Sequence, residues 1–244
     1  MDPGRDAEGF RKFDHHAGVS VSRGRLIVFE GPEGVGKTTQ LRLLGEWLEE
    51  RGLAHTRVRE PGGTRLGDEI RRLLLDPENE IGPRAEALLF MASRAALITE
   101  IVQPALERGE LVLADRFFLS TFAYQIEGRG LPESEIRGAN AFATGGLVPD
   151  LTLLFTAPSE ERSVRRALRG STDRMERAGS DFHARVEQAF ARCLAPDWQV
   201  DHPECGPIVP LDATGSEAQV LERVLVVLGQ WWPQIIPVLD GSLQ

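Results

Sequence analysis

The sequence GPEGVGKTT at residues 31–39 limits what this chain can fold into more than any other stretch. The apolar run Leu26–Phe29 precedes it, and an amphipathic segment with Leu41, Leu44 and Leu48 on one face follows it. This order of strand, glycine-rich turn and helix is the context that a phosphate-binding loop requires. The glycines allow backbone N–H groups to point at an anion, and the helix N-terminus adds a favourable potential. The stretch therefore predicts a nucleoside triphosphate site.

Two side chains of this loop have separate expected roles. Lys37 is expected to reach the β- and γ-phosphates, and the Thr38 hydroxyl to hold Mg²⁺. Lys12 and Lys37 are the only lysines, beside many arginines, so a lysine stands where a compact ammonium on a flexible stem is useful. The residues expected to contact ATP are Gly31, Gly34, Val35, Gly36, Lys37, Thr38 and Thr39.

Composition narrows the class of protein. A chain of 244 residues can bury a full core, and one α/β domain is expected. The net charge of -9 argues against a nucleic-acid coat or a membrane-surface protein, because both favour basic faces. Cys193 and Cys205 lack metal or redox spacing and are interpreted as free thiols. No apolar run approaches the roughly 20 residues of a membrane span, so a cytoplasmic protein is expected.

Strand and helix patterns alternate along the chain, which predicts a parallel sheet of about five strands flanked by helices. Besides the first strand, strands are expected at 54–59, 111–116, 151–156 and 207–211. Besides the first helix, helices are expected at 66–74, 83–108, 119–125 and 216–229. We expect a disordered extension at 1–23, one domain at 24–230 and a tail at 231–244 that packs on the domain or on a partner.

Three further features point to the chemistry of a phosphotransferase. Asp115 ends a buried strand, where a P-loop protein usually has its partner for the Mg²⁺ shell. Phe90 and Arg94 share a helix face and either grip a planar base or form an ordinary core and surface pair. Arginines crowd residues 159–177, which we interpret as a lid over phosphates, although a salt-bridged surface helix would have the same pattern.

The motifs together resemble those of bacterial thymidylate kinases, over about residues 24–229. The resemblance is carried by EGPEGVGKTT at 30–39, REPGGT at 59–64, Asp115-Arg116 with the following Ser120-Thr121 and Ala123-Tyr124-Gln125, and PDLTL at 149–153. Many families share the phosphate loop, but its combination with REPGGT is close to unique. The resemblance implies a P-loop nucleoside monophosphate kinase-like three-layer fold. It also implies transfer of the γ-phosphoryl of ATP to dTMP on a cytoplasmic homodimer, with Mg²⁺.

Residue roles follow from the resemblance by matching position. It implies that Phe90 stacks on thymine, that Arg94 donates to the edge of the base, and that Glu33 meets the 3′-OH region. The implied catalytic residues are Lys37, Arg116, Arg169 and Glu33. The implied substrate-binding residues are Glu33, Arg71, Phe90, Arg94, Arg116, Thr121, Tyr124 and Gln125, and the implied metal ligands are Thr38 and Asp115.

The family divides into two groups, and Gly34 places this chain in the group whose needed arginine lies in the lid. Arg169, before Gly170, is the candidate. Phe117 and Phe118 stand where the family often has a polar side chain, which weakens the case for a polar contact there. A kinase with another acceptor, such as dUMP or a deoxynucleoside, remains an alternative. So do a P-loop ATPase switch, which needs neither the Phe–Arg pair nor the lid, and an inactive binding module.

Overall fold

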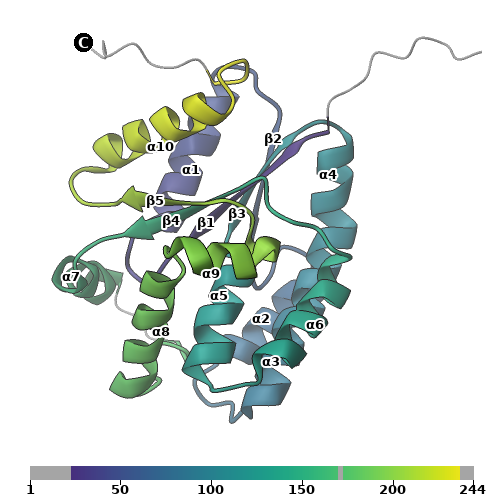
Figure 1. Cartoon of the computed structure of the whole chain (residues 1–244), viewed down its shortest axis with the longest axis vertical. Coiled ribbons are helices and arrows are strands. Elements are labelled where there is room, and N and C mark those ends of the chain that lie inside the picture. The colour runs from purple at the N-terminus through teal and green to yellow at the C-terminus, as the bar shows by residue number, and fades with distance from the viewer. Residues whose placement is uncertain (1–22, 170–172, 237–244) are drawn as a thin grey trace, which may run out of the picture.

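The computed structural model describes residues 23–169 and 173–236, with no side chains described at 168 and 169. Five strands form one all-parallel sheet in the order β2-β3-β1-β4-β5 (Figure 1). The strands are β1 (Arg25–Glu30), β2 (His55–Arg59), β3 (Leu111–Asp115), β4 (Leu151–Thr156) and β5 (Ile208–Asp212). The expected α/β class and five-stranded parallel sheet are confirmed.

The sheet places the ends of three motifs side by side. Strand β1 is central, with β3 on one side and β4 on the other, and Phe29 and Arg59 both pair with Asp115 in the register. The carboxyl ends of parallel strands lie at one edge. Strands β2 and β3 lie on one side of β1, and the later strands β4 and β5 lie on its other side, so the winding of the sheet reverses beside β1. A crevice at such a switch point is the usual ligand site of an open parallel sheet.

Helices cover both faces of the sheet. One face is packed by α1 (Lys37–Glu49) and α10 (Glu217–Trp231), whose buried side chains form one core cluster with those of the strands. The second cluster lies on the other face, under α3 (Pro83–Leu97), α4 (Gln103–Glu107), α5 (Phe118–Thr121) and α8 (Ser180–Arg192). The remaining helices of the described chain are α2 (Arg65–Leu75), α6 (Glu133–Thr144), α7 (Ser159–Arg169), α9 (Pro196–Asp201) and the short 3₁₀-helix Pro203–Cys205.

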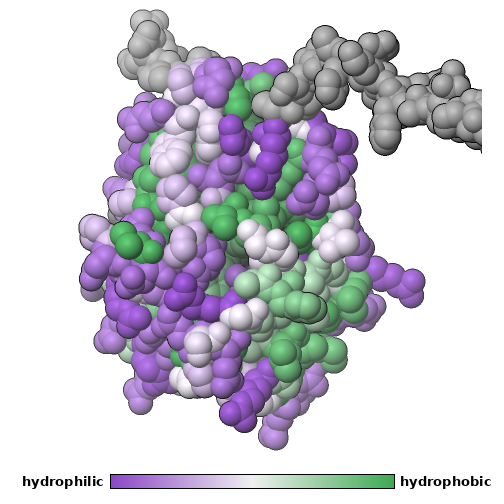
Figure 2. Space-filling view, turned by 45° about the vertical axis from the view of Figure 1, so that its right-hand side comes forward, coloured by the Kyte–Doolittle hydropathy of each residue, from purple (hydrophilic) through white to green (hydrophobic). Residues whose placement is uncertain are grey.

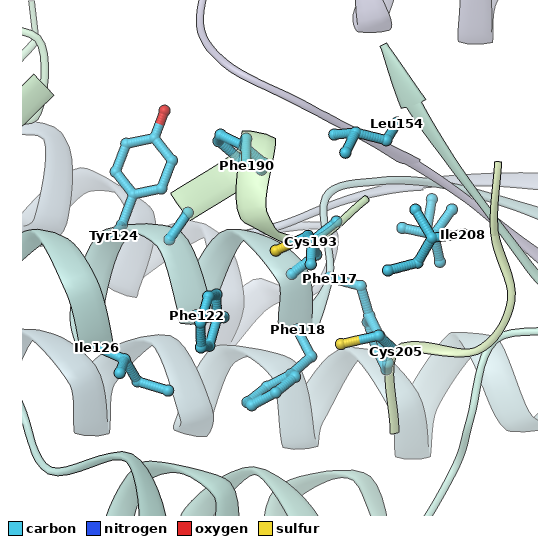
Figure 3. Packing of buried hydrophobic residues seen from close by; sticks show 14 of the residues in the cluster. Phe117, Phe118, Phe122, Tyr124, Ile126, Leu154, Phe190, Cys193, Cys205 and Ile208 are labelled. Carbon is cyan, nitrogen blue, oxygen red and sulfur yellow. The ribbon is translucent and has the colours of Figure 1, made fainter. Parts of the chain in front are cut away.

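The second cluster is rich in aromatic rings and supports the functional edge from below. Figure 3 shows Phe118 and Phe122 within the cluster, with Tyr124 at its border and the Tyr124 hydroxyl directed away from Phe122. Both cysteines are buried in this cluster and are free thiols, as expected. Tyr124 thus has its ring anchored in the core and its polar end available to the cavity described below.

The expected helix at 83–108 is continuous, but its middle turn differs. Residues Ile98–Val102 form a π-helical turn (η1) between α3 and α4. Pro104 lacks an N–H to donate and its ring crowds the carbonyl four residues earlier, so a wider turn ahead of it relieves the clash. A second π-helix (η2) covers Phe122–Gly128, where the sequence indicated an ordinary helix.

Three helices were absent from the sequence-based expectations: α6, α8 and α9. Helix α6 contains Gly138 and Asn140 and buries few apolar side chains, so its sequence shows no clear helical period of apolar residues. Helix α8 does have the period, with Phe182, Val186 and Phe190 buried on one face.

The two chain ends lie partly within the described residues. The expected extension falls outside them apart from residue 23. The beginning of the expected tail continues the domain, because α10 runs to Trp231 and both Trp232 and Ile236 are buried against it in the first cluster. No helix in 23–169 or 173–236 is long and apolar enough to cross a bilayer.

Candidate active site

A cavity of about 770 Å³ opens at the carboxyl edge of the sheet. Its walls combine segments that are far apart in the sequence: 33–40, 59–61, Phe90 with Arg94, 115–117, 120–121 with 124–125, and parts of 165–176 and 213–220. The phosphate loop and the predicted base-binding residues therefore line one continuous space. This juxtaposition was expected from the motifs, and the strand register explains it, since each motif follows or faces the end of a strand.

The phosphate loop is wrapped around the Lys37 ammonium. Gly36, with a φ of 98°, turns the chain into α1, and Lys37 Nζ donates to Gly31 O at 2.9 Å and to Pro32 O at 3.0 Å. Burial, together with the charge of Arg116, lowers the pKa of Lys37 to about 7, although the nearby carboxylates act in the opposite direction. A buried cation with only carbonyl partners is a strong attractor for an anion.

Gly34 lies directly beneath α7, the first part of the segment interpreted as a lid. It has a φ of +77°, and a Cβ built there would lie 2.5 Å from Arg162 O. Arg162 is itself held by Ala157 O at 3.1 Å and by Glu187 at 2.7 Å. Only glycine allows the backbone of the loop and that of α7 to approach this closely.

One arginine of α7 that the sequence analysis did not single out reaches the cavity. Arg165 lines it, with Nη1 3.4 Å from Val35 O and Nη2 3.2 Å from Ala213 O. The crowding of arginines in this stretch was visible in the sequence, but which one faces inward depends on the position of α7. The side chain of the predicted Arg169 lies outside the described residues.

Thr38 and Asp115 meet as expected for a metal site. The Thr38 hydroxyl donates to Asp115 Oδ2 at 2.5 Å, joining the start of α1 to the end of β3. A hydroxyl and a carboxylate beside a phosphate loop suit Mg²⁺, which prefers oxygen ligands and keeps several waters. Within the described residues no group of three or more acidic, His or Cys side chains could hold a metal, so phosphate and water oxygens would complete the shell.

Arg116 has the most constrained backbone of the site. Its φ is 77°, a value that no other non-glycine residue in 23–169 or 173–236 adopts. Its guanidinium lies 2.8 Å from Ser120 Oγ and 3.3 Å from Gly31 O, and stands over the Tyr124 ring. Strain of this kind persists only where the surroundings enforce it, and it is often found at functional sites.

Glu30 holds the backbone around Arg116 in place, a role that the sequence-based expectations did not include. The side chain is completely buried, and it accepts from Phe117 N at 2.7 Å, Ser120 N at 2.9 Å and Ser120 Oγ at 2.6 Å. It thereby fixes the turn that carries Arg116 from β3 into α5. A carboxylate at the end of an otherwise apolar strand was the available signal. Phe117 and Phe118 are both buried, in agreement with the doubt about a polar contact there.

Phe90 and Arg94 both line the cavity, and Arg94 also bonds to the protein itself. It is buried, its Nε and Nη2 engage Glu60, and its Nη1 donates to Asn140 Oδ1 at 2.8 Å. Most of the N–H groups of Arg94 therefore already have partners within the protein. The residue is positioned rigidly at the base end of the cavity.

Tyr124 and Glu33 bridge the two ends of the cavity. The Tyr124 hydroxyl lies 3.3 Å from Glu33 Oε1, and burial raises the pKa of Tyr124, so the hydroxyl stays protonated and donates. Glu33 Oε2 is buried without a hydrogen-bond partner among the described residues. An unpaired carboxylate oxygen in a cavity wall is the acceptor that a ligand hydroxyl would satisfy.

The other predicted residues also reach the cavity. Arg71 lines it beside the turn at 59–64 and donates from Nη1 to Pro61 O at 2.9 Å. Gln125 and Thr121 line it as well and are otherwise buried. Of the loop residues, Gly34, Val35, Gly36, Lys37, Thr38 and Thr39 line the wall, and Gly31 contributes its carbonyl to Lys37 and Arg116.

The parallel sheet, the phosphate loop after β1 and the second group of cations across the cavity define a P-loop nucleotide-binding protein of the nucleoside monophosphate kinase-like class. The family model of thymidylate kinase matches residues 29–200. Thymidylate kinase of Deinococcus radiodurans is 46% identical over 210 residues, covering 86% of this chain and 98% of the relative. Thymidylate kinase of Gloeobacter violaceus is 48% identical over 201 residues, covering 82% and 92%. The chain belongs to the thymidylate kinase family.

Proposed function

We propose that this protein phosphorylates dTMP, transferring the γ-phosphoryl group of ATP to give dTDP and ADP. The observation that carries the proposal is that one cavity joins the phosphate loop to an end built from Phe90, Arg94 and Gln125. Family membership supports the same activity. An ATPase switch would need only the end that contains the phosphate loop.

The transfer requires two phosphate groups to lie in line and their repulsion to be neutralised, with little covalent help from the protein. Lys37 and the loop N–H groups hold the donor phosphates. Arg71 and Arg116 hold the phosphate of dTMP, which no nucleoside acceptor would require. Arg169, whose side chain lies outside the described residues, is proposed to stabilise the charge of the transferring group. The acceptor is already an oxyanion, so no general base is needed.

Thr38 and Asp115 are the residues of this chain that fit Mg²⁺, and a bound Mg²⁺ would neutralise charge on the β- and γ-phosphates. In this role the two side chains act as oxygen donors at the end of β3 and the start of α1. The carboxylates of the site thus position and bind, rather than transfer protons.

The sugar and base of dTMP occupy the other end. The Phe90 ring stacks on thymine, and Arg94 donates to the edge of the base with the N–H that Glu60 and Asn140 leave available. Glu33 Oε2 accepts from the 3′-OH of the sugar. Tyr124 stands against the sugar, where it disfavours a ribose 2′-OH, and Thr121 lies beside it in the wall.

The protein is proposed to act as a homodimer in the cytoplasm. Exposed hydrophobic side chains lie on three neighbouring helices: Leu66 and Leu73 on α2, Leu88 on α3, and Phe142 on α6. Figure 2 shows hydrophobic side chains gathered in the lower part of one face of the molecule. A second copy of the chain would remove this surface from water, which is a favourable source of association energy.

A coupled ADP-release assay tests the proposal. The full-length protein with ATP and Mg²⁺ is supplied with dTMP, dUMP, dCMP, thymidine or no acceptor, and dTMP is expected to have the highest kcat/KM. Preference for dUMP or thymidine would indicate a related kinase. ATP turnover that is independent of any acceptor would indicate an ATPase switch, and binding of ATP without turnover would indicate an inactive binding module.

A further inference from the structure

A buried carboxylate lies behind the base end of the cavity and has no part in the proposed transfer. Glu86, in the first turn of α3, has no exposed surface and accepts hydrogen bonds from three side chains. Its Oε1 accepts from Gln125 Nε2 at 3.0 Å and from Arg129 Nε at 3.1 Å. Its Oε2 accepts from Arg129 Nη2 at 2.9 Å and from Arg174 Nη2 at 2.8 Å. The carboxylate therefore connects α3, the end of η2 and the segment that returns from the lid.

Glu86 is ionised in this setting. Burial raises its pKa, but the hydrogen bonds from Arg129, Gln125 and Arg174, together with the charge of Arg129, outweigh burial and hold the pKa below its usual value. An ionised carboxylate has no proton to give, so it can only accept hydrogen bonds. Whatever faces Glu86 must therefore be a donor.

This requirement determines which way the Gln125 amide points. An amide has one donor end and one acceptor end, and Glu86 demands the donor end. Gln125 Oε1 is then left on the cavity side, where Gln125 forms part of the wall and where Oε1 has no hydrogen-bond partner among the described residues. The cavity wall consequently presents a fixed acceptor at this point.

A fixed acceptor distinguishes between pyrimidines. Thymine and uracil carry an N3–H donor between two carbonyls, whereas cytosine has an unprotonated N3 that accepts. A turned amide would reverse the preference, because its NH₂ group would face the cavity. Sites built to hydrogen-bond a substrate group discriminate strongly, since a mismatch leaves buried polar atoms unpaired.

We propose that Glu86 is a specificity-determining positioning residue, which locks the Gln125 amide so that the site takes a pyrimidine that donates from N3 and rejects one that accepts there. The proposal rests on the proposed function of the cavity as the dTMP site. Glu86 acts through Gln125 and touches no substrate. Its second oxygen, with Arg129 and Arg174, keeps the carboxylate from turning.

The variant Glu86→Gln tests the proposal, because its own amide has a preferred orientation. Oε2 accepts from two arginine N–H groups, whereas Oε1 accepts from one, Arg129 Nε at 3.1 Å. The carbonyl oxygen of the new amide is therefore favoured at the Oε2 position, and its NH₂ group then faces Gln125. Gln125 must then turn. In steady-state assays of the full chain with ATP and Mg²⁺, kcat/KM for dTMP and dUMP is expected to fall together by about tenfold or more, while that for dCMP holds or rises.

Two comparisons separate this effect from general damage. Glu133→Gln, on α6, removes a carboxylate paired with Arg137 and His202 away from the cavity, and the ratio of dTMP to dCMP should stay at its wild-type value. In a Gln125→Leu background, adding Glu86→Gln should leave that ratio unchanged, since the coupling passes through Gln125. Equal losses for dTMP and dCMP in folded Glu86→Gln protein would overturn the proposal.

A measurement on the wild-type protein keeps the proposal testable if the variant fails to fold. The Gln125 side-chain N–H signals, assigned by their loss in Gln125→Leu, should include one proton that exchanges slowly with solvent before any nucleotide is added. Rapid exchange of both protons would contradict the fixed orientation of the Gln125 amide. A wild-type protein that neither binds nor phosphorylates dTMP would instead contradict the proposed function. The two failures are distinguishable because the exchange measurement uses no nucleotide.

Discussion

The cations of the active site are held by oxygen atoms of the protein itself. Lys37 rests on two loop carbonyls, Arg71 on Pro61 O, and Arg116 on Ser120 and Gly31. Pre-positioned charges stabilise a transferring phosphoryl group without reorganising during the reaction. Both arginines are thus oriented before substrates bind. In a variant, loss of turnover can therefore be measured separately from loss of substrate binding.

Arg169→Ala is expected to lower kcat far more than dTMP affinity. An arginine that reaches the transferring group acts in the transition state and can be worth about 10³–10⁵-fold in rate. Steady-state kinetics combined with calorimetric binding of dTMP measures both quantities. Arg108→Ala, in an exposed pair with Glu110 far from the loop, is the control and should behave as wild type. Equal losses of kcat and dTMP affinity would refute this division.

Phe90→Ala is expected to weaken dTMP binding by about 1–3 kcal/mol, the value found for stacking of a base on an aromatic ring. Phe90→Tyr retains the ring and should keep most of the affinity, provided the added hydroxyl is accommodated in the cavity. Calorimetry with dTMP and with ATP reports the two ends separately, and ATP affinity should not change. An unaltered dTMP dissociation constant in Phe90→Ala would remove the stacking role.

The ion pairs of Glu86 are expected to make the free energy of unfolding depend on pH. Its folded-state pKa is depressed, so the ion pairs contribute stability that is present above the unfolded value and lost as the pH falls through the folded value. Near pH 7, Glu86→Gln should cost about 1.5–3 kcal/mol, the worth of hydrogen bonds to a charged group. In urea unfolding this difference should shrink as the pH drops below 4.5, the ordinary pKa of a glutamate side chain. A difference that stays constant down to pH 3 would contradict the ionised state.

At the scale of elements, the contact between the phosphate loop and α7 explains the glycine at position 34. The loop backbone and the Arg162 carbonyl would be too close for any side chain at that position. The same contact places Arg165 over the loop, where it reaches Val35 O and Ala213 O. The position of α7 is therefore coupled to the conformation of the phosphate loop.

Gly34→Ala should displace α7 and raise the KM for ATP. Gly52 offers a matched control, because its φ of +66° imposes similar backbone strain while nothing lies within 4 Å of an added Cβ. Both variants should lose comparable stability from the backbone term, but only Gly34→Ala should lose activity in ATP titrations. Comparable KM values for ATP in the two variants would show that position 34 requires glycine because of backbone strain alone, and that the contact with α7 has no effect.

The sequence was most informative where one local pattern decides one local structure. The phosphate loop, the strands and the pairing of Thr38 with Asp115 followed from spacing, since strand ends of a parallel sheet must meet at one edge. Buried polar partners were harder to predict. Glu30, Glu60 and Glu86 bond to groups between 34 and 90 positions away, and nothing in the local pattern pairs them. The π-helical turns likewise depend on packing that no local period encodes.

At the scale of the whole molecule, the exposed hydrophobic side chains of α2, α3 and α6 stand on the side of the second core cluster. Phe142 is 92% exposed and Leu88 is 63% exposed, although helices α3 and α6 pack directly against each other. Single exposed apolar residues are common on monomers, but several on adjacent helices indicate an interaction surface. Of these helices, α3 also carries Phe90 and Arg94, so association there would stiffen the wall of the base end.

Replacing both Phe142 and Leu88 with Asp should therefore convert a dimer into a monomer. Two charges placed in a buried apolar interface would have to be desolvated without partners, which disfavours association strongly. Sedimentation velocity should show wild-type protein as a dimer of the 26.9 kDa chain and the variant as a single chain. Val200→Asp, which alters a 79% exposed side chain on α9, should remain dimeric. A wild-type protein that sediments as one chain at micromolar concentrations would mean that this face is free, and the stiffness of the base end would then have to come from Glu60, Asn140 and Glu86 alone.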